Sequence, residues 1–190
     1  KSSGSASTRR RSSRTRGIVV STLGVLGARE YLPRIAPLLD SPEFRGTAAE
    51  ALGRLNAKEF IPQIAKLLDM PGSDRSSAIR ALGWLGAKEY IPQIAQLLGS
   101  PGEDVRGNAA EALGWLGAKE CVPQILPLLG DSSHYVRSVS SRALDALIAK
   151  EHIPRIAALL GDQDSDVRSY AASALGQLDA LGVGQVEGDA

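Results

Sequence analysis

The residue types that most often carry out chemistry are scarce in this sequence and form no recognised catalytic or metal-binding set. The chain has two histidines, His134 and His152, and one cysteine, Cys121. It contains no Gly-Lys-Ser phosphate loop and no His-Glu-x-x-His motif. Aspartates at alternate positions of residues 162–166 have the spacing of a calcium loop, but the glycine and the bidentate glutamate of such a loop are missing. The sequence therefore predicts no catalytic residue, no bound metal and no cofactor.

The same sequence unit recurs about every 30 residues along the chain. Its first leucine falls at Leu23, Leu52, Leu82, Leu113, Leu144 and Leu175. Seven residues before each of these leucines stands an arginine: Arg16, Arg45, Arg75, Arg106, Arg137 and Arg168. Six copies of one unit predict a repeat protein.

Each unit is predicted to form two helices. In the third copy the first helix is expected over residues 87–98, where Pro92 near its start costs little because the earliest amides lack partners. The second helix is expected to start near Val105 or Arg106 and to run to Leu116, and Gly117 is suited to end it. A single helix pair cannot bury its apolar stripe, so neighbouring pairs must stack. The prediction is an all-α fold, a right-handed α-solenoid of about five to six helical hairpins.

At one position of the repeat, two copies have residues that could be reactive, and we expect both to have a structural role. Cys121 and His152 stand where other copies have Tyr31, Phe60 and Tyr90. We therefore expect this position to belong to the core, with Cys121 as a buried, inert thiol.

The string from Val105 to Ala118, Val-Arg-Gly-Asn-Ala-Ala-Glu-Ala-Leu-Gly-Trp-Leu-Gly-Ala, resembles HEAT-like repeats of the phycobilisome-lyase (EZ-HEAT) type. The resemblance covers roughly residues 16–178. Only the fifth copy departs from it strongly, because Asp145 and Ile148 replace the two glycines of the motif. The resemblance implies a scaffold, of the kind found in bilin lyases and in interaction arrays of larger proteins, and does not by itself imply an enzyme.

The family resemblance also implies an aspartate six residues before the arginine of each unit. Three copies keep this spacing: Asp69 with Arg75, Asp131 with Arg137, and Asp162 with Arg168. Ser100 takes the place of the aspartate before Arg106. We expect these arginines, and Arg45 with them, to be structural and to join each turn to the next repeat through carboxylates or turn carbonyls.

Positions two, five and nine residues after each arginine share one stripe of the second helix. The middle position alternates in charge along the array: Glu50, Arg80, Glu111 and Arg142. The last position holds Arg54 and the only two tryptophans, Trp84 and Trp115. Solenoids bind partners along the surface formed by their second helices, and tryptophan is enriched in binding hot spots. The stripe is thus a candidate site for a protein or peptide; the alternative is a solvated charge ladder with tryptophans packed over neighbouring stems.

The charged residues are unevenly distributed along the chain, whose formal net charge is only +1. Residues 1–16 contain six bases and no acid, whereas the remainder has 16 bases and 21 acids. We predict a flexible basic Ser/Arg-rich segment over 1–16, a repeat array over 17–180 and a glycine-rich tail over 181–190. The basic segment is either a plain linker or an electrostatic arm for nucleic acid, anionic lipid or an acidic protein patch. No apolar run approaches the ~18 residues of a membrane span, and a single cysteine fits a reducing compartment, so a cytoplasmic location is expected.

The array is predicted to open on a second helix that carries Ile-Val-Val at residues 18–20, where a middle copy has Asn-Ala-Ala at residues 108–110. Terminal repeats normally carry polar caps. We therefore expect this helix to contact sequence outside these 190 residues, the basic segment, or another domain or chain, and we expect the sequence to be part of a larger protein or assembly.

These observations predict a non-catalytic scaffold that binds a protein or peptide along its second helices. One alternative is a bilin-lyase-like subunit, in which the two tryptophans stack on a tetrapyrrole, although no acid–base set accompanies them. The other is a nucleic-acid-binding HEAT-like domain that uses the basic N-terminal arm. The acidic repeat body, whose stripe arginines are offset by glutamates, argues against duplex nucleic acid as its partner.

Overall fold

The computed structural model forms two compact units, unit 1 (residues 1–90) and unit 2 (residues 91–190). All its secondary structure among the described residues is helical, as the sequence predicts. His152, the aspartates at 164 and 166 and the predicted tail over 181–190 lie outside those residues. The described residues are 3–147, 153–163, 165, 168–169, 171–172 and 175–176.

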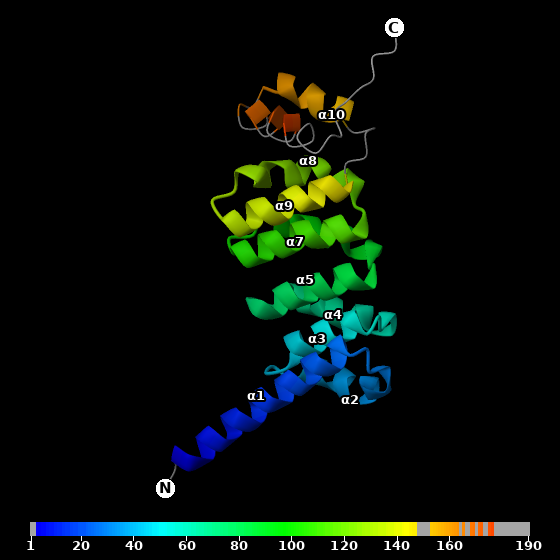
Figure 1. The fold of residues 1–190 in the computed structure, drawn as a ribbon, viewed down its shortest axis with the longest axis vertical. Helices are drawn as coiled ribbons and strands as arrows, with labels where there is room; N and C mark the ends of the chain where they lie inside the picture. The colour runs from blue at the N-terminus through cyan, green and yellow to red at the C-terminus, as the bar shows by residue number, and fades with distance from the viewer. Residues whose placement is uncertain are drawn as a thin grey trace. The chain divides into compact units, whose positions relative to one another are not determined.

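Unit 1 alternates long second helices with short first helices that are flanked by 3-10 turns (Figure 1). The second helices lie side by side and are α1 (Ser3–Val25), α3 (Arg45–Arg54) and α5 (Ser73–Leu85). The first helices are α2 (Leu32–Ile35) and α4 (Ile61–Ala65). The 3-10 turns are η1 (Arg29–Tyr31), η2 (Ala36–Asp40), η3 (Lys58–Phe60), η4 (Lys66–Asp69) and η5 (Lys88–Tyr90).

Unit 2 repeats this plan. Its second helices α7 (Glu103–Leu116) and α9 (His134–Leu147) pack against each other. The first helices are α6 (Ile91–Gln96), α8 (Val122–Ile125) and α10 (Ile153–Ala158). The 3-10 turns are η6 (Leu97–Gly99), η7 (Lys119–Cys121), η8 (Leu126–Gly130) and η10 (Leu159–Gly161).

The helix α1 extends further toward the N-terminus than the repeat pattern predicts. It runs without a break from Ser3 to Val25, so the expected boundary between the basic segment and the array falls inside one helix. Arginine is a good helix former and the segment contains no proline, which allows the helix to continue. Although α1 has 23 residues, none of the described helices combines enough length and apolar character to cross a membrane.

The first helices are shorter than the sequence pattern suggests, because each divides into an α-helical and a 3-10 part. In α2 and α8 the α-helical part has only four residues, and a second proline, Pro37 or Pro127, follows in the 3-10 turn. A proline at this depth lacks the N–H that an α-helix needs. In α6 Gln96 takes the equivalent place, and the α-helical part reaches six residues.

Glycine and alanine bring the second helices of each unit into close contact. In unit 1 a Cβ built on Gly53 would lie 2.9 Å from the Cα of Ala81 on the next second helix. In unit 2 the same contact joins Gly114 to Ala143 at 3.0 Å. The repeated leucine beside these glycines, such as Leu52, is fully buried. Burial of one leucine stabilises by roughly 1.5–3 kcal/mol, so this repeated pair of residues supplies both the spacing and the core.

The second helices end at a residue in the left-handed conformation. Gly27, Gly86 and Gly117 have φ between 68° and 70°, and Asn56 takes the same place with φ 50°. Glycine has no Cβ to clash here, and asparagine tolerates the conformation better than most residues. The predicted stop at Gly117 is confirmed.

Candidate functional site

In unit 1 the charged residues of the second-helix stripe pair across neighbouring repeats. Glu50 lies on α3 and Arg80 on α5, with the Oε1 and Nη1 atoms 3.3 Å apart. The hydroxyl of Ser77 also donates a hydrogen bond of 2.9 Å to the same carboxylate oxygen. The pair is partly exposed, so its contribution to stability is on the order of 1 kcal/mol or less.

Trp84 is enclosed by the arginines of this stripe. The guanidinium carbons of Arg54 and Arg80 lie 4.9 Å and 5.0 Å from the centre of its ring system. Its ring edge also lies beside the backbone of Gly53, since a Cβ built there would be 3.1 Å from Cε3. Trp84 is consequently half-buried. The indole ring serves as a packing surface for two cations, an arrangement typically stabilised by about 0.5–1 kcal/mol for each exposed pair.

A small polar hollow lies beside this cluster, between α1, α3 and α5. Its volume is about 250 Å³. Three hydroxyl groups, one carboxylate and one guanidinium line it, together with apolar and backbone atoms. The lining residues are Gly17, Ile18, Ser21, Thr47, Glu50, Ala51, Arg54 and Ser77.

In unit 2 the corresponding tryptophan is much more accessible. Trp115 on α7 has 45% of its surface exposed. In place of Arg80, its own helix carries Glu111 four residues earlier, and this carboxylate pairs with Arg142 of α9 at 3.2 Å. A hollow of about 150 Å³ adjoins the ring, with an apolar floor and the ion pair at its edge. Its lining residues are Glu111, Gly114, Trp115, Val139, Arg142, Ala143 and Ala146.

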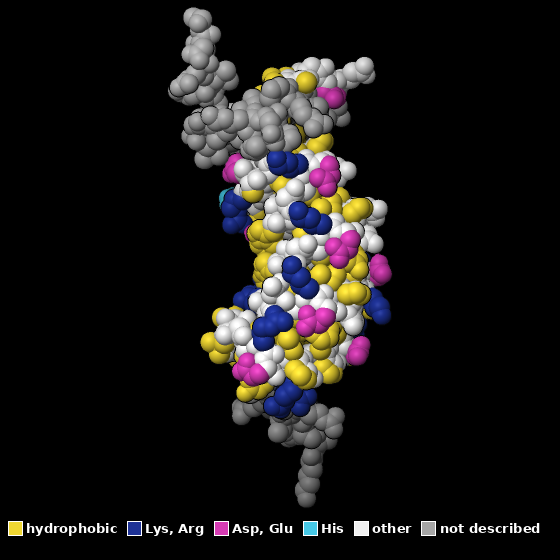
Figure 2. Space-filling view, turned by 90° about the vertical axis from the view of Figure 1, so that its right-hand side faces the viewer, with side chains coloured by type: hydrophobic (Ala, Val, Ile, Leu, Met, Phe, Trp, Pro, Cys, Tyr) yellow, Lys and Arg dark blue, Asp and Glu magenta, His cyan; other side chains and the backbone are white. Residues whose placement is uncertain are grey.

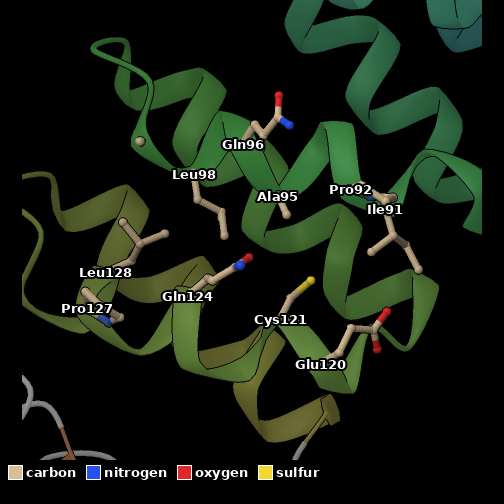
Figure 3. Close-up of a pocket in the computed structure, with 11 residues that line it drawn as sticks. Ile91, Pro92, Ala95, Gln96, Leu98, Glu120, Cys121, Gln124, Pro127 and Leu128 are labelled. Carbon is tan, nitrogen blue, oxygen red and sulfur yellow. The ribbon is translucent and has the colours of Figure 1, made fainter.

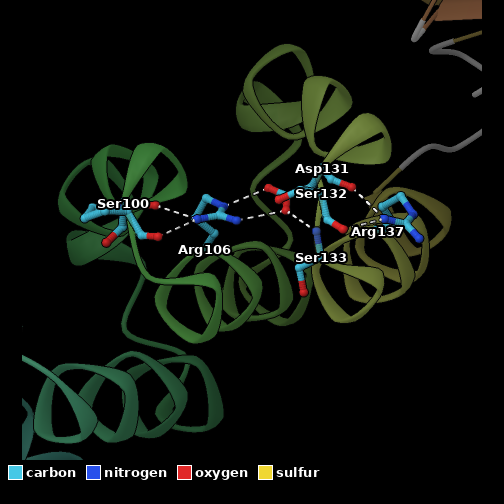
Figure 4. A network of polar contacts seen from close by, with 7 residues as sticks. Ser100, Arg106, Asp131, Ser132, Ser133 and Arg137 are labelled. Atoms are coloured by element: carbon cyan, nitrogen blue, oxygen red, sulfur yellow. Dashed lines mark hydrogen bonds and ion pairs between the residues drawn. The ribbon is translucent and has the colours of Figure 1, made fainter.

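The repeated arginines hold the turns of the array together, as the network in Figure 4 shows for unit 2. Arg106 donates two hydrogen bonds, of 2.7 and 2.8 Å, to the two carboxylate oxygens of Asp131 in the next repeat. It also donates to the carbonyl oxygens of Ser100 and Pro101 in its own turn, at 2.9 and 3.0 Å. The backbone N–H of Ser133 donates a further bond of 2.8 Å to Asp131. The hydrogen bond between the two side chains raises the pKa of Arg106 and lowers the pKa of Asp131.

Other copies of the arginine use part of this arrangement. Arg137 and Arg168 each donate to two carbonyl oxygens of the turn before their helix, those of Asp131 and Ser132 and those of Asp162 and Gln163. Arg75 donates to the carbonyl of Leu68, next to Asp69. Arg45 approaches a carboxylate that the six-residue spacing did not point to, that of Asp74 at 3.5 Å.

Unit 2 also contains a groove on its first helices that the sequence interpretation missed (Figure 3). It has a volume of about 920 Å³ and runs between α6 with η6 and α8 with η8. Cys121 is buried in its wall, and this burial raises the pKa of the thiol. The signal in the sequence was the proline and glutamine that recur at exposed first-helix positions. The lining residues are Ile91, Pro92, Ala95, Gln96, Leu98, Gly99, Glu120, Cys121, Gln124, Pro127 and Leu128.

The charges on the surface are mixed rather than of one sign. On the face shown in Figure 2, basic and acidic side chains lie close together in each unit. The turns into α2, α4, α6 and α8 each contribute an exposed pair of opposite charges: Arg29 and Glu30, Lys58 and Glu59, Lys88 and Glu89, Lys119 and Glu120. Neutralising nucleic acid phosphates needs clustered basic residues, which this face of the described surface does not provide.

Comparison with known proteins identifies the family. The family model described as HEAT repeats matches residues 61–144 and 122–186. Among solved structures, the complex of CpcE and CpcF of phycocyanin lyase from Nostoc sp. PCC7120 matches with TM-score 0.62 and 23% identity, covering 85% of this chain and 70% of that chain. An engineered protein matches with TM-score 0.54 and 20% identity, over 94% and 93% of the two chains. A designed armadillo repeat protein matches with TM-score 0.51 and 20% identity, over 85% and 92%.

No curated protein matches the sequence. The structural matches are below 25% identity and therefore concern the fold, which is that of helical-repeat solenoids. The predicted α-solenoid of HEAT-like hairpins is thus confirmed, and the family match covers well over half of the chain. This chain belongs to the family of HEAT-repeat proteins.

Proposed function

We propose that this chain is a non-catalytic interaction scaffold that binds a protein or peptide along its second helices. The observation that carries the proposal is Trp115, a large aromatic side chain that is 45% exposed beside an apolar hollow. Tryptophan is enriched among residues that dominate binding energy, especially where it adjoins a pocket. Glu111 and Arg142 at the edge of the hollow offer a hydrogen-bond acceptor and donors to a partner.

Two further features support a binding role. Unit 1 places hydroxyl, carboxylate and guanidinium groups around a second hollow on its own second helices, which suits contacts with a polypeptide backbone. HEAT repeats are matched over most of the chain, and stacked helical repeats provide extended binding surfaces. A cytoplasmic location is part of the proposal, because the single cysteine needs no oxidising compartment.

The proposal is tested by site-specific photo-crosslinking in a lysate of the source cells. A photoreactive amino acid at position 142 lies beside the Trp115 hollow, and one at position 124 lies in the first-helix groove as a matched control. We expect a discrete partner to be crosslinked from position 142 and lost when Trp115→Ala is added. Equal crosslinking from both positions, or no effect of Trp115→Ala on a variant with an unchanged circular dichroism spectrum, would contradict it.

A bilin-lyase-like subunit is a second candidate, supported by the fold similarity to the phycocyanin lyase complex. In that case the Trp115 ring would stack on a tetrapyrrole. Titration of the protein with a bilin then shifts the visible absorbance of the pigment, and Trp115→Ala weakens the shift. An unchanged spectrum excludes this candidate and leaves the binding scaffold in place.

A further inference from the structure

Helix α1 exposes a strip of apolar side chains at helical spacing. Ile18, Val19, Val25 and Leu26 are each half exposed or more, and Thr22 between them is also exposed. Residues three and four apart share one face of a helix. These five residues, called the α1 strip below, therefore form one continuous surface. A contiguous apolar patch on a protein surface marks an interaction site.

Three of these five positions, those of Val19, Thr22 and Leu26, are buried in the repeat that follows. Leu26 is 73% exposed, whereas its counterparts Leu55 and Leu85 in unit 1 are 3% and 1% exposed. Val19 is 50% exposed, and its counterpart Ala48 has no exposed surface. Val19, Thr22 and Leu26 thus lie on the face that a second helix uses for stacking in this fold, here presented to solvent. Ile18 and Val25 extend this surface onto the adjacent stripe, where Arg54, the counterpart of Val25, is also exposed.

The element that packs on the equivalent positions elsewhere in unit 1 indicates what kind of structure could pack on the α1 strip. The preceding second helix packs there, because a Cβ built on Gly24 of α1 would lie 2.8 Å from the Cα of Ala51 on α3. Thr22 is the counterpart of Ala51 within the α1 strip. The surface that fits the α1 strip is therefore the face of another helix.

The charges near the α1 strip indicate which charged residues that helix carries. Inside the chain an arginine of one repeat meets an aspartate of the next, as in Arg45 with Asp74 at 3.5 Å and Arg106 with Asp131 at 2.7 Å. The first 29 residues contain no acid, and Arg14 beside the strip is exposed. An incoming helix that carried the arginine of this repeat would meet only positive charge on α1. A second copy of the chain would also bring another basic segment of charge +6. Carboxylates on the incoming helix would instead be attracted.

We infer that the α1 strip docks an acidic amphipathic helix of another protein, with its apolar stripe on Val19 and Leu26 and its carboxylates near Arg14. The α1 strip and the Trp115 hollow of unit 2 consist of different residues, so an experiment can refute one proposal without affecting the other. The apolar contact supplies the affinity, and the arginines orient the helix and raise its association rate.

The test uses the full chain and a fluorescein-labelled designed peptide with a leucine stripe and glutamates on the other positions. A second peptide has the same leucines with lysines in place of the glutamates. Fluorescence anisotropy is expected to show binding of the acidic peptide only. Leu26→Asp should weaken it by about tenfold or more, whereas Leu160→Asp, at an exposed leucine of unit 2, and Trp115→Ala should leave it unchanged.

Four outcomes would overturn the inference. They are equal binding of the two peptides, no binding of the acidic peptide, no effect of Leu26→Asp, and a greater loss with Leu160→Asp than with Leu26→Asp. Tighter Leu26-dependent binding of duplex DNA or of vesicles containing phosphatidylserine would assign the strip to a different class of ligand. Sedimentation that shows a wild-type dimer abolished by Leu26→Asp would assign it to a second copy. Because Leu26 is largely exposed, its substitution should leave the melting temperature nearly unchanged, and this measurement accompanies the titrations.

Discussion

The Arg106–Asp131 network allows a quantitative prediction for the substitution Asp131→Asn. The two side chains are 15% and 8% exposed and are joined by two hydrogen bonds. Exposed ion pairs contribute about 0–1 kcal/mol, whereas removal of one partner from a buried pair costs about 3–5 kcal/mol. The Arg106 pair lies between these limits, because the substitution leaves a largely buried guanidinium that keeps its bonds to the carbonyls of Ser100 and Pro101. We therefore expect a loss of about 2 kcal/mol in the free energy of unfolding of unit 2.

The measurement is urea unfolding followed by tryptophan fluorescence in a Trp84→Phe background, where the remaining tryptophan, Trp115, lies in unit 2. For a urea dependence of about 2 kcal/mol per M, the midpoint should fall by about 1 M. Glu120→Gln, which removes an exposed carboxylate from the same unit, should change stability by less than about 0.5 kcal/mol. Equal effects of the two substitutions would refute the assignment of a stabilising role to the network.

The loss of stability caused by Asp131→Asn is also expected to depend on pH. The pKa of Asp131 is lower in the folded protein than in the unfolded chain, because its hydrogen bond with Arg106 favours the ionised form. Its stabilising contribution is therefore complete above the unfolded pKa of about 3.9 and is lost as the pH falls through the folded value. The difference in midpoint between wild type and Asp131→Asn should be constant from pH 5 to 7 and shrink in increasingly acidic buffer. A difference that stays constant down to about pH 2 would show that it does not depend on ionisation.

Three further substitutions and one thiol reaction test the packing. Gly53→Ala should lower the melting temperature, because the new Cβ would lie 2.9 Å from the backbone of Ala81 and crowding of this kind costs about 1–3 kcal/mol. As a control on α1, Gly17→Ala should raise the melting temperature, because its Cβ meets nothing within 4 Å and alanine has the better helix propensity. Asn56→Gly should stabilise unit 1 by a few tenths of a kcal/mol in urea unfolding, since glycine adopts the φ of 50° found there without the steric cost of a Cβ. A loss of stability would show that asparagine bears no such cost at this position. Cys121 should react slowly with a thiol reagent such as DTNB until the chain is unfolded, because burial raises its pKa; rapid reaction of the native protein would show that the groove opens.

The repeat plan of the fold could be predicted from the sequence because its signals are local. The leucines and arginines recur at fixed spacing, and the backbone at Gly117 needs a residue that tolerates a left-handed conformation. The division of the first helices was not predicted from the sequence. A second proline four residues after the first, at Pro37 and Pro127, accounts for the shortest α-helical parts, those of α2 and α8. The helices α4 and α6 also divide but have no second proline, so proline alone does not explain the division.

The state of each tryptophan could not be predicted, because it depends on side chains from more than one repeat. The sequence places Trp84 and Trp115 at the same point of the stripe and predicts a common role. In the structure Arg54 reaches Trp84 from the preceding second helix and Arg80 from its own. The position of a long arginine side chain over a ring follows from packing between repeats, which the spacing of residues within one repeat does not determine.

The contrast between the two tryptophans shows how equivalent positions of a repeat array can differ in exposure. The residue four positions before the tryptophan on the same helix is Arg80 in one repeat and Glu111 in another. A guanidinium at this position lies over the indole ring, whereas the carboxylate of Glu111 turns to Arg142 of the next repeat. The ring quadrupole does not attract a carboxylate at this position. The place of Arg54, the other arginine over Trp84, is taken one repeat later by Trp84 itself, so both positions of the cluster differ for Trp115. Trp115 is the more exposed of the two rings, with 45% of its surface accessible.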